Sequence, residues 1–384
     1  MQPITCNEDL RKLYLKRVPR MFVDYCESGS WTEATLRRNL EDFARIQLHQ
    51  RVAMGVEGGN MAITMLGQDV VMPVALAPVG MLGMQHADGE MLAARAALDF
   101  GVPFTLSTMS ICSIEDVAAF VGRPFWFQLY VMRDHGFIGL LIDRAKAAGC
   151  SALVLTLDLQ VMGQRHRDLR NGLSTPPRPT LGNLANLAMH PGWCLAMART
   201  RRHGFGNIAG HVKGVSDMSS LSAWTAEQFD RGLDWEDVEW IKQRWGGKLV
   251  LKGILDPGDA RRAIDYGADA IVVSNHGGRQ LDGAPSSISV LPEIAARVGG
   301  DCEVWLDSGV RSGQDVFKAL ALGARGVMLG RAYVYGLGAL AEAGVTTALQ
   351  LIQRELDLTM VLCGVRSIAG IDRRVLHEAA RPTG

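Results

Sequence analysis

Short apolar runs alternate with helical stretches from residue 73 to residue 331, and this rhythm constrains the fold more than any other feature of the sequence. Apolar strands separated by helices predict a parallel sheet that is buried on both faces. Eight such units are the number that closes a (β/α)8 barrel. The eight runs are PVALAPVG (73–80), PFTLST (103–108), FWFQLYV (125–131), ALVLTLD (152–158), KLVLKG (248–253), AIVVSNHG (270–277), EVWLDSG (303–309) and GVMLGR (326–331).

A doubly wound open sheet is the alternative architecture. It would carry the glycine fingerprint GxGxxG after its first strand, and no such motif follows PVALAPVG. We therefore predict an α/β protein with the TIM-barrel fold, as a single domain over residues 1–384. Its parts are an N-terminal helical segment at 1–70, a barrel at 73–335 and C-terminal helices at 336–384.

The connection between the fourth and fifth strands is far longer than an ordinary crossover, and it predicts an insert at about 169–232. Residues 169–216 contain no Asp or Glu, whereas Arg and Lys residues alternate there with Leu, Met and Trp. This composition leaves two interpretations open. The insert is either a long surface loop or a basic amphipathic element that lies on an anionic membrane surface.

The composition argues against several other classes of protein. Forty Lys and Arg residues balance forty Asp and Glu residues, which argues against nucleic acid as the main partner. The seven cysteines are scattered without CxxC spacing, so we expect reduced thiols and neither a disulfide framework nor a metal site. The first residues lack the apolar core of a secretory signal, and no apolar run is long enough to predict a membrane span.

Polar residues or glycines follow all eight predicted strands, although the strand interiors are apolar. Working groups of such barrels lie where the strands end, so we expect these residues to meet at one mouth. They are Pro78, Gly80, Ser107, Gln128, Tyr130, Thr156, Asp158, Lys252, Ser274, His276, residues 307–311, Gly330 and Arg331.

The last two strand ends predict a phosphate site. LDSGVRSG and LGRA supply glycine amides together with Arg311 and Arg331. Barrels commonly bind phosphate at this corner, and a guanidinium matches phosphate oxygens in geometry. The alternative interpretation is that both arginines only bind loop carbonyls.

Lys252 ends an apolar strand, where a buried ammonium is costly unless it faces an anion. A flavin ring fits this requirement because its reduced form develops negative charge. The neutral side chains of Ser107, Gln128 and Thr156 match the polar edge of such a ring. Alternatively, each of them is a satisfied polar residue of the core.

SNHGGRQLDG, residues 274–283, combines a base with a carboxylate-binding cation. His276 titrates near neutral pH and suits a general base, and Arg279 can hold a carboxylate by two parallel hydrogen bonds. Asp158 is placed to stabilise the imidazolium, and Arg165 is a candidate second donor or a solvated loop charge. This combination predicts a 2-hydroxy acid as the substrate, with Tyr130 and Tyr25 as candidate hydroxyl donors.

Two other functional classes remain open. A phosphate-binding barrel that processes a nucleotide or isoprenoid phosphate would use the same corner without needing His276 beside Arg279. A non-catalytic flavin-binding module would need neither a base nor a carboxylate clamp.

With these residues considered, the chain resembles the family of FMN-dependent α-hydroxy acid dehydrogenases and oxidases. The resemblance extends from VPRMFVDYCESGS to VLCGVRSI, and its most specific element is SNHGGRQLDG. FKALALGA and the following GR pair support it. APVGMLGM, LVLKGILDP, HPGW and FGNIAG are most similar to the bacterial quinone-linked L-lactate dehydrogenase branch.

The resemblance implies a role for each matching residue. His276 would remove the hydroxyl proton with Asp158 as its partner, and the substrate would be held by Arg279, Arg165, Tyr25 and Tyr130. FMN would lie against Pro78, Val79 and Gly80, with ring contacts from Ser107, Gln128, Thr156, Lys252 and Ser274. Its ribityl chain and phosphate would lie on Asp307, Gly309, Arg311, Gly330 and Arg331.

The branch also implies a substrate, an acceptor and a location. We expect L-lactate as the substrate, a membrane quinone as the acceptor, a tetramer, and peripheral attachment through about 176–215 to the cytoplasmic side of the inner membrane. Cys26, Met109 and Gly80 stand where many relatives have tyrosine, aromatic residues and alanine, which predicts a roomier pocket. (S)-Mandelate or another larger 2-hydroxy acid therefore stays open as the substrate, and oxygen stays open as the acceptor.

Overall fold

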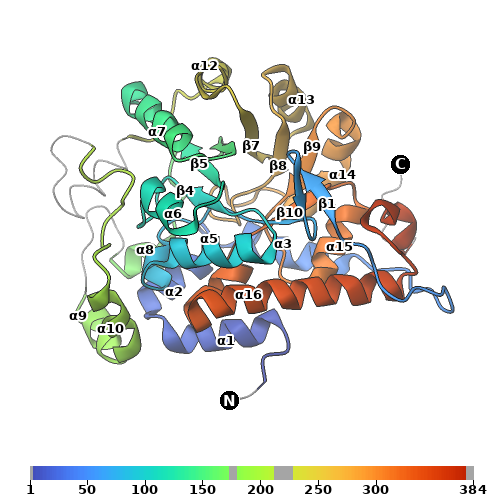
Figure 1. Ribbon diagram of the computed structural model, residues 1–384, viewed down its shortest axis with the longest axis horizontal. Helices are drawn as coiled ribbons and strands as arrows, with labels where there is room; N and C mark the ends of the chain where they lie inside the picture. Colours follow the sequence, from blue (N-terminus) through green and yellow to red (C-terminus); the bar gives the residue numbers. More distant parts are fainter. Residues whose placement is uncertain (1–2, 173–179, 212–227, 378–384) are drawn as a thin grey trace.

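The computed structural model describes residues 3–172, 180–211 and 228–377, and its centre is a sheet of eight parallel strands (Figure 1). Hydrogen bonds join neighbours in the order β3-β10-β9-β8-β7-β6-β5-β4, and a parallel bridge between Leu76 and Phe104 closes the ring. The predicted (β/α)8 barrel is therefore confirmed. The strands are β3 (Val74–Leu76), β4 (Thr105–Ser107), β5 (Trp126–Tyr130), β6 (Ala152–Thr156), β7 (Lys248–Ile254), β8 (Ala270–Val273), β9 (Glu303–Leu306) and β10 (Gly326–Leu329).

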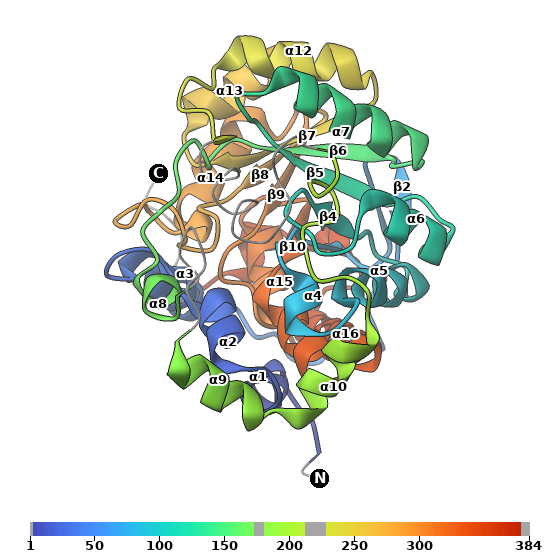
Figure 2. The same ribbon diagram turned by 90° about the vertical axis from the view of Figure 1, so that its left-hand side faces the viewer.

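Helices lie around the outside of the barrel (Figures 1 and 2). Several begin at a capping box in which a Ser or Asp side chain binds a backbone amide of the first turn, as at Ser113, Asp234 and Ser312. The helices from β3 onward are α4 (Leu82–Gln85), α5 (Gly89–Phe100), α6 (Ile114–Val121), α7 (His135–Ala147), α8 (His166–Arg170), α9 (Leu181–Ala188), α10 (Pro191–Arg199), α12 (Trp235–Trp245), α13 (Pro257–Asp265), α14 (Ser287–Val298), α15 (Gly313–Ala321) and α16 (Arg331–Leu362).

The inside of the barrel is apolar at one end and polar at the other. At the apolar end, Trp126 and Trp305 stack with ring centroids 5.1 Å apart and fill the barrel at the N-terminal ends of the strands. Alternate residues of a strand share a face, so the inward row of β7 passes from Val250 to Lys252, and that of β6 passes from Val154 to Thr156. The polar ends of the rows lie together because all eight strands are parallel.

The N-terminal segment, predicted as a helical segment at 1–70, is helical only in part. Its helices are α1 (Asn7–Arg17), α2 (Arg20–Glu27) and α3 (Ala34–Arg45), but its last part is an antiparallel hairpin of β1 (Ile63–Met65) and β2 (Gln68–Val70). Leu66 and Gly67 form the two-residue turn with φ of 48° and 80°, a conformation that glycine favours. Met65 and Leu66 pack in the same cluster as Trp126 and Trp305, so the hairpin closes the floor of the barrel.

The boundary that we expected between residues 335 and 336 falls inside α16. This helix runs from Arg331 to Leu362 and is kinked at Leu340 and Ala341, which have non-helical backbone angles. Its N-terminal half follows β10, where a barrel helix is expected, and its C-terminal half packs against the start of α15, where the Gly313 amide donates to Glu355 at 2.7 Å. The single-domain organisation stays a prediction.

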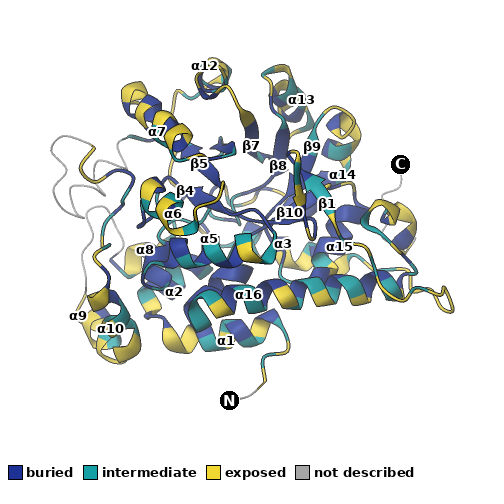
Figure 3. Cartoon of the chain, viewed as in Figure 1, coloured by how far each residue is buried: buried dark blue, intermediate teal, exposed yellow. Residues whose placement is uncertain are grey.

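The insert after β6 carries α8, α9 and α10, whereas residues 173–179 and 212–227 of the predicted 169–232 lie outside the described residues. In both ribbon views, α9 and α10 lie beside α1 and α2, away from the barrel (Figures 1 and 2). Phe22 of α2 stacks on Trp193 of α10 at 5.2 Å, and the backbone amide of Arg20 donates to Asn186 at 2.7 Å. The outer faces of α9 and α10 are exposed (Figure 3).

Candidate active site

The loop after β8 holds His276 in an unusual backbone conformation. His276, Gly277 and Gly278 have φ of 57°, 69° and 73°, three successive residues in the left-handed region. Their amides are bound by Ser274 Oγ at 3.1 Å, Ser308 Oγ at 2.9 Å and the side chain of Asn275 at 3.0 Å. Glycine tolerates this region, but histidine is strained there. The two glycines of SNHGG, with the hydroxyls of Ser274 and Ser308, therefore form the turn that directs the imidazole into the mouth.

His276 and Asp158 form a pair at the mouth. His276 Nδ1 lies 2.8 Å from Asp158 Oδ1, with Asp158 following β6 and His276 following β8. Burial lowers the pKa of His276 below its ordinary value, although the Asp158 carboxylate opposes this shift. Burial alone would raise the pKa of Asp158, but the adjacent His276 outweighs burial, and the pKa of this carboxyl is lowered overall. The pair therefore rests as neutral imidazole and carboxylate, which leaves Nε2 free to accept a proton.

Two guanidinium groups flank Tyr25 at the end of α2. The Arg279 guanidinium lies 4.7 Å from the centre of the Tyr25 ring, and that of Arg165 lies 5.9 Å from it. Arg279 also donates to the carbonyls of Tyr25 and Ser28, whereas Arg165 lies 3.5 Å from Asp168. Burial and the neighbouring Arg279 lower the pKa of Arg165. Two close, partly buried cations favour an anionic ligand between them.

One wall of the cavity is apolar, and most of its residues were not predicted from the sequence. Tyr130 at the end of β5 packs edge-on against Phe229 with ring centroids 5.8 Å apart. Phe229 is bridged to Met132, and the residue after Phe205 binds the Ser110 carbonyl at 3.2 Å. The segments of the insert at Phe205 and at Phe229 thus both return to the barrel mouth. Nothing in the local sequence of Phe205 or Phe229 indicates this return, because it depends on the path of the whole insert.

Lys252 lies in a buried ion pair below His276. Its ammonium is 2.9 Å from Asp307 and donates to Ser274 Oγ at 2.8 Å. Burial alone would lower the pKa of Lys252, but Asp307 and Asp158 outweigh it and raise this pKa. Lys252 therefore stays protonated inside the barrel. Asp307 also accepts a hydrogen bond from Ser308, another residue of the predicted strand end at 307–311.

The next group of predicted residues lies in the barrel wall. Gln128 Oε1 accepts hydrogen bonds from Ser107 Oγ at 3.1 Å and from the Thr108 amide at 3.3 Å. Within the described ranges, Gln128 Nε2 and Thr156 Oγ1 are buried and have no hydrogen-bond partner. An unsatisfied buried polar group costs about 1–3 kcal/mol. These two atoms therefore indicate a ligand with a polar edge.

The corner after β9 and β10 is rich in positive charge. Arg331 donates to the carbonyls of Cys26, Gly277 and Ser28 at 2.7, 3.0 and 3.0 Å, which uses three of its five N–H groups. Burial and the nearby Arg311 lower the pKa of Arg331 to about 10. Arg331 thus binds loop carbonyls, as one interpretation expected, but it keeps two donors for an anion beside Arg311.

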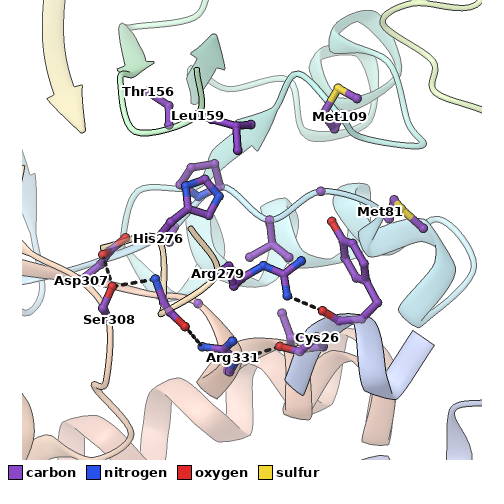
Figure 4. Close-up of a pocket in the computed structure, with 18 of the residues that line it drawn as sticks. Cys26, Met81, Met109, Thr156, Leu159, His276, Arg279, Asp307, Ser308 and Arg331 are labelled. Carbon is purple, nitrogen blue, oxygen red and sulfur yellow. Dashed lines mark hydrogen bonds between the residues drawn. The ribbon is translucent and has the colours of Figure 1, made fainter. Parts of the chain in front are cut away.

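Most of the predicted residues line one cavity of about 270 Å³ (Figure 4). In Figure 4, Thr156, Leu159 and Met109 lie on one side of His276 and Arg279, and Arg331 lies on the other. Asp158, Ser107, Gln128 and Ser274 are not part of the lining and support it from behind. The predicted residues on the lining are Tyr25, Pro78, Val79, Gly80, Tyr130, Thr156, Arg165, Lys252, His276, Arg279, Asp307, Gly309, Arg311, Gly330 and Arg331.

A family model described as FMN-dependent dehydrogenase matches residues 15–378. The chain belongs to the FMN-dependent dehydrogenase family. This dehydrogenase is therefore an enzyme with FMN as its cofactor, as the resemblance implied.

Individual relatives cover nearly the whole enzyme. An L-lactate dehydrogenase of Caulobacter vibrioides is 46% identical over 382 residues, which are 99% of this chain and 100% of the relative. One of Chromohalobacter salexigens is 45% identical over 98% of this chain and 97% of its own. Among solved structures, the monotopic membrane protein (S)-mandelate dehydrogenase is 36% identical with a TM-score of 0.93, over 98% of this chain and 100% of that chain. A mandelate oxidase is 38% identical with a TM-score of 0.83, over 98% of each chain.

The residues around the cavity fit FMN. The unpaired Gln128 Nε2 and Thr156 Oγ1 match the polar edge of its ring, and protonated Lys252 matches the negative charge of its reduced form. Gly309 has φ of 103°, and a Cβ there would lie 2.2 Å from the Asn39 carbonyl oxygen. Only glycine fits this position, and it lets the backbone of the β9 loop pass directly against the Asn39 carbonyl before it reaches Arg311.

Proposed function

We propose that this dehydrogenase oxidises an L-2-hydroxy acid to the 2-oxo acid, with L-lactate to pyruvate as the first candidate, and that the electrons pass to a membrane quinone. One observation carries the proposal. His276, held by Asp158 at 2.8 Å, faces the same cavity as Arg279 and Arg165. A base beside two carboxylate-binding cations suits an acid that carries a hydroxyl on the neighbouring carbon.

Each group of this cavity would have a defined task. Arg279 and Arg165 would hold the substrate carboxylate, while the hydroxyls of Tyr25 and Tyr130 would orient the substrate. His276 would accept the hydroxyl proton at Nε2, because Nδ1 is bound to Asp158, and this carboxylate would stabilise the resulting imidazolium. The remaining change is the loss of the C2 hydrogen with two electrons. FMN supplies the acceptor for these two electrons when it is bound.

The cofactor would be held by three sets of residues. Ser107, Gln128, Thr156 and Ser274 would bind or support the polar edge of the ring, and Lys252 would stabilise its reduced form. Pro78, Val79 and Gly80 would lie against the ring. Asp307, Gly309, Arg311, Gly330 and Arg331 would hold the ribityl chain and the phosphate.

A second substrate candidate is (S)-mandelate or another larger 2-hydroxy acid. The apolar wall of Phe205, Phe229, Met109 and Met162 favours it, as does the similarity to (S)-mandelate dehydrogenase. The similarity to L-lactate dehydrogenases at 45–46% identity favours L-lactate. Oxygen is the alternative acceptor, favoured by the similarity to mandelate oxidase.

We expect the FMN-loaded protein to be yellow and to lose its absorbance when L-lactate is added without oxygen. The measurement is an anaerobic titration with L-lactate, D-lactate, (S)-mandelate and longer L-2-hydroxy acids. Bleaching by other L-2-hydroxy acids alone would reassign the substrate, and bleaching by none would refute the proposed reaction. Faster colour recovery with a soluble quinone than with air supports the quinone acceptor, and the reverse supports an oxidase.

The exposed face of α9 and α10 supports peripheral attachment to a membrane. Leu181, Leu184, Met189 and Leu195 are 53–86% exposed, and residues 180–211 contain no acidic residue. None of the helices in the described ranges meets the length and apolarity that a membrane span needs. We therefore propose attachment through about 176–215 to the cytoplasmic side of the inner membrane, of which 176–179 and 212–215 lie outside the described residues. The tetramer also stays an expectation from the family.

Replacing Leu181 and Leu184 with serine is expected to weaken binding to phosphatidylglycerol vesicles on the order of 100-fold, because two leucine side chains no longer enter the lipid. Co-sedimentation at low and high salt measures this effect. The matched control replaces Leu358 and Leu362 of α16 with serine. These leucines are 51% and 53% exposed, and the control should bind vesicles like the wild type. Wild-type protein that remains in the supernatant at every salt concentration would contradict the attachment.

A further inference from the structure

Gln280 belongs to SNHGGRQLDG, but none of the roles above uses it. Its side chain is buried, and its Nε2 donates to the carbonyls of Asp158 and Val161, both at 2.8 Å. Its Oε1 accepts the amide of Gly163 at 3.2 Å. Both N–H groups and the carbonyl of the side chain are thus in use. One residue of the β8 loop binds three backbone groups of the loop after β6.

These two loops carry complementary halves of the active site. The β8 loop carries His276 and Arg279, and the loop after β6 carries Asp158 and Arg165. The distance between the loops therefore sets both the His276–Asp158 contact and the spacing of the two guanidinium groups. A shift of either loop would change both at once.

The loops also approach each other closely at Gly163. A Cβ on Gly163 would lie 2.4 Å from the carbonyl oxygen of Arg279 and 2.9 Å from that of Gln280. Both atoms are backbone atoms, so no side chain fits unless the loops move apart. Gly163 thus permits the close approach of the two loops, and the hydrogen bonds of Gln280 hold the loops together.

Side-chain packing between the two loops is incomplete. A second cavity of about 300 Å³ lies between them, lined by Asp158, Val161 and Gly163 on one side and by Gln280 on the other, and Val161 is 49% exposed. A side chain next to a void lacks dispersion contacts on that side. The position of Asp158 therefore depends on hydrogen bonds more than on neighbouring side chains.

We propose that Gln280 is a positioning residue that fastens the β6 loop to the β8 loop, and so holds Asp158 against His276 and Arg165 beside Arg279. The consequence for turnover rests on the proposed function. The placement of Asp158 against His276 does not, and it is measurable without turnover.

The test replaces Gln280 with methionine, which has a similar size but cannot donate the two hydrogen bonds to Asp158 and Val161 or accept the one from the Gly163 amide. Gln85→Met is the matched control, since Gln85 is also buried, donates to the Phe22 carbonyl at 3.1 Å, accepts from Tyr14 Oη at 2.7 Å, and is far from both loops in sequence. We expect Q280M to lower kcat/KM on the order of 100-fold, the effect of a misplaced reacting group, and to raise KM. Q85M should lower only the melting temperature.

The pKa of His276, measured by NMR of histidine-labelled protein, gives a readout besides activity. Asp158 raises this pKa, so its withdrawal should lower the pKa in Q280M and in Gly163→Ala, and leave it unchanged in Q85M. The acidic limb of kcat/KM should move to lower pH with it. A folded, FMN-loaded Q280M with the wild-type pKa and KM would overturn the inference. A wild type that no 2-hydroxy acid bleaches would refute the proposed function alone.

Discussion

Replacing His276 with alanine is expected to leave the protein yellow and to slow anaerobic bleaching by the hydroxy acid about 10²- to 10⁴-fold, the usual contribution of a positioned base. The imidazole is hydrogen-bonded to Asp158, which is not among the residues predicted to bind FMN, so its loss should not release the cofactor. Its other nitrogen, Nε2, is the one available to the substrate in the cavity. Rapid-mixing absorbance measurements give the rate, and the flavin content of the purified variant shows that the cofactor is retained.

The backbone at position 276 calls for a second variant. His276 has φ of 57°, a conformation that alanine adopts at a cost and that asparagine tolerates better. His276→Asn should therefore fold like the wild type and bleach as slowly as H276A. His166→Ala, at an exposed position in α8, is the matched control and should retain the wild-type rate. Rapid bleaching by H276N would refute the role of His276 as the base.

Arg279→Met is expected to raise KM for the hydroxy acid by roughly 30-fold to several thousand-fold, since loss of one partner of a buried, hydrogen-bonded charge pair costs about 2–5 kcal/mol. Arg279 also donates to the carbonyls of Tyr25 and Ser28, so the variant frees the end of α2 and should lower kcat as well. Steady-state kinetics separate the two effects.

A lysine at this position separates charge from geometry. Arg279→Lys keeps the charge, but its ammonium is a single point of donation and cannot replace a planar fork. It should recover only part of the loss in KM. Arg167→Met is the matched control, because Arg167 binds Glu33 at the surface and does not line the cavity. An R279M enzyme with wild-type KM would exclude Arg279 from the carboxylate site.

The barrel and its mouth were predictable because both follow from local patterns. Strand periodicity fixes which residues point inward, and parallel strands bring their C-terminal ends together. Lys252, Thr156 and His276 could thus be assigned to one cavity from their positions at strand ends. The β1–β2 hairpin was missed because its strands are only three residues long, too short for a period to be recognised.

Contacts that depend on long chain paths were not predictable. Phe205 and Phe229 reach the cavity only because two separate segments of the insert return to the mouth, and no nearby residue indicates this. The bonds of Arg331 to Cys26, Ser28 and Gly277 join three distant segments. For this arginine the sequence left phosphate binding and carbonyl binding as alternatives, and the geometry leaves room for both.

The filled floor of the barrel has a consequence for how such an enzyme changes over evolutionary time. Trp126, Trp305 and the hairpin residue Met65 supply rigidity at the end opposite the chemistry. Substitutions in the mouth loops can therefore alter substrate preference without eroding the part of the molecule on which folding depends. One barrel can therefore acquire new substrate preferences while its fold stays stable.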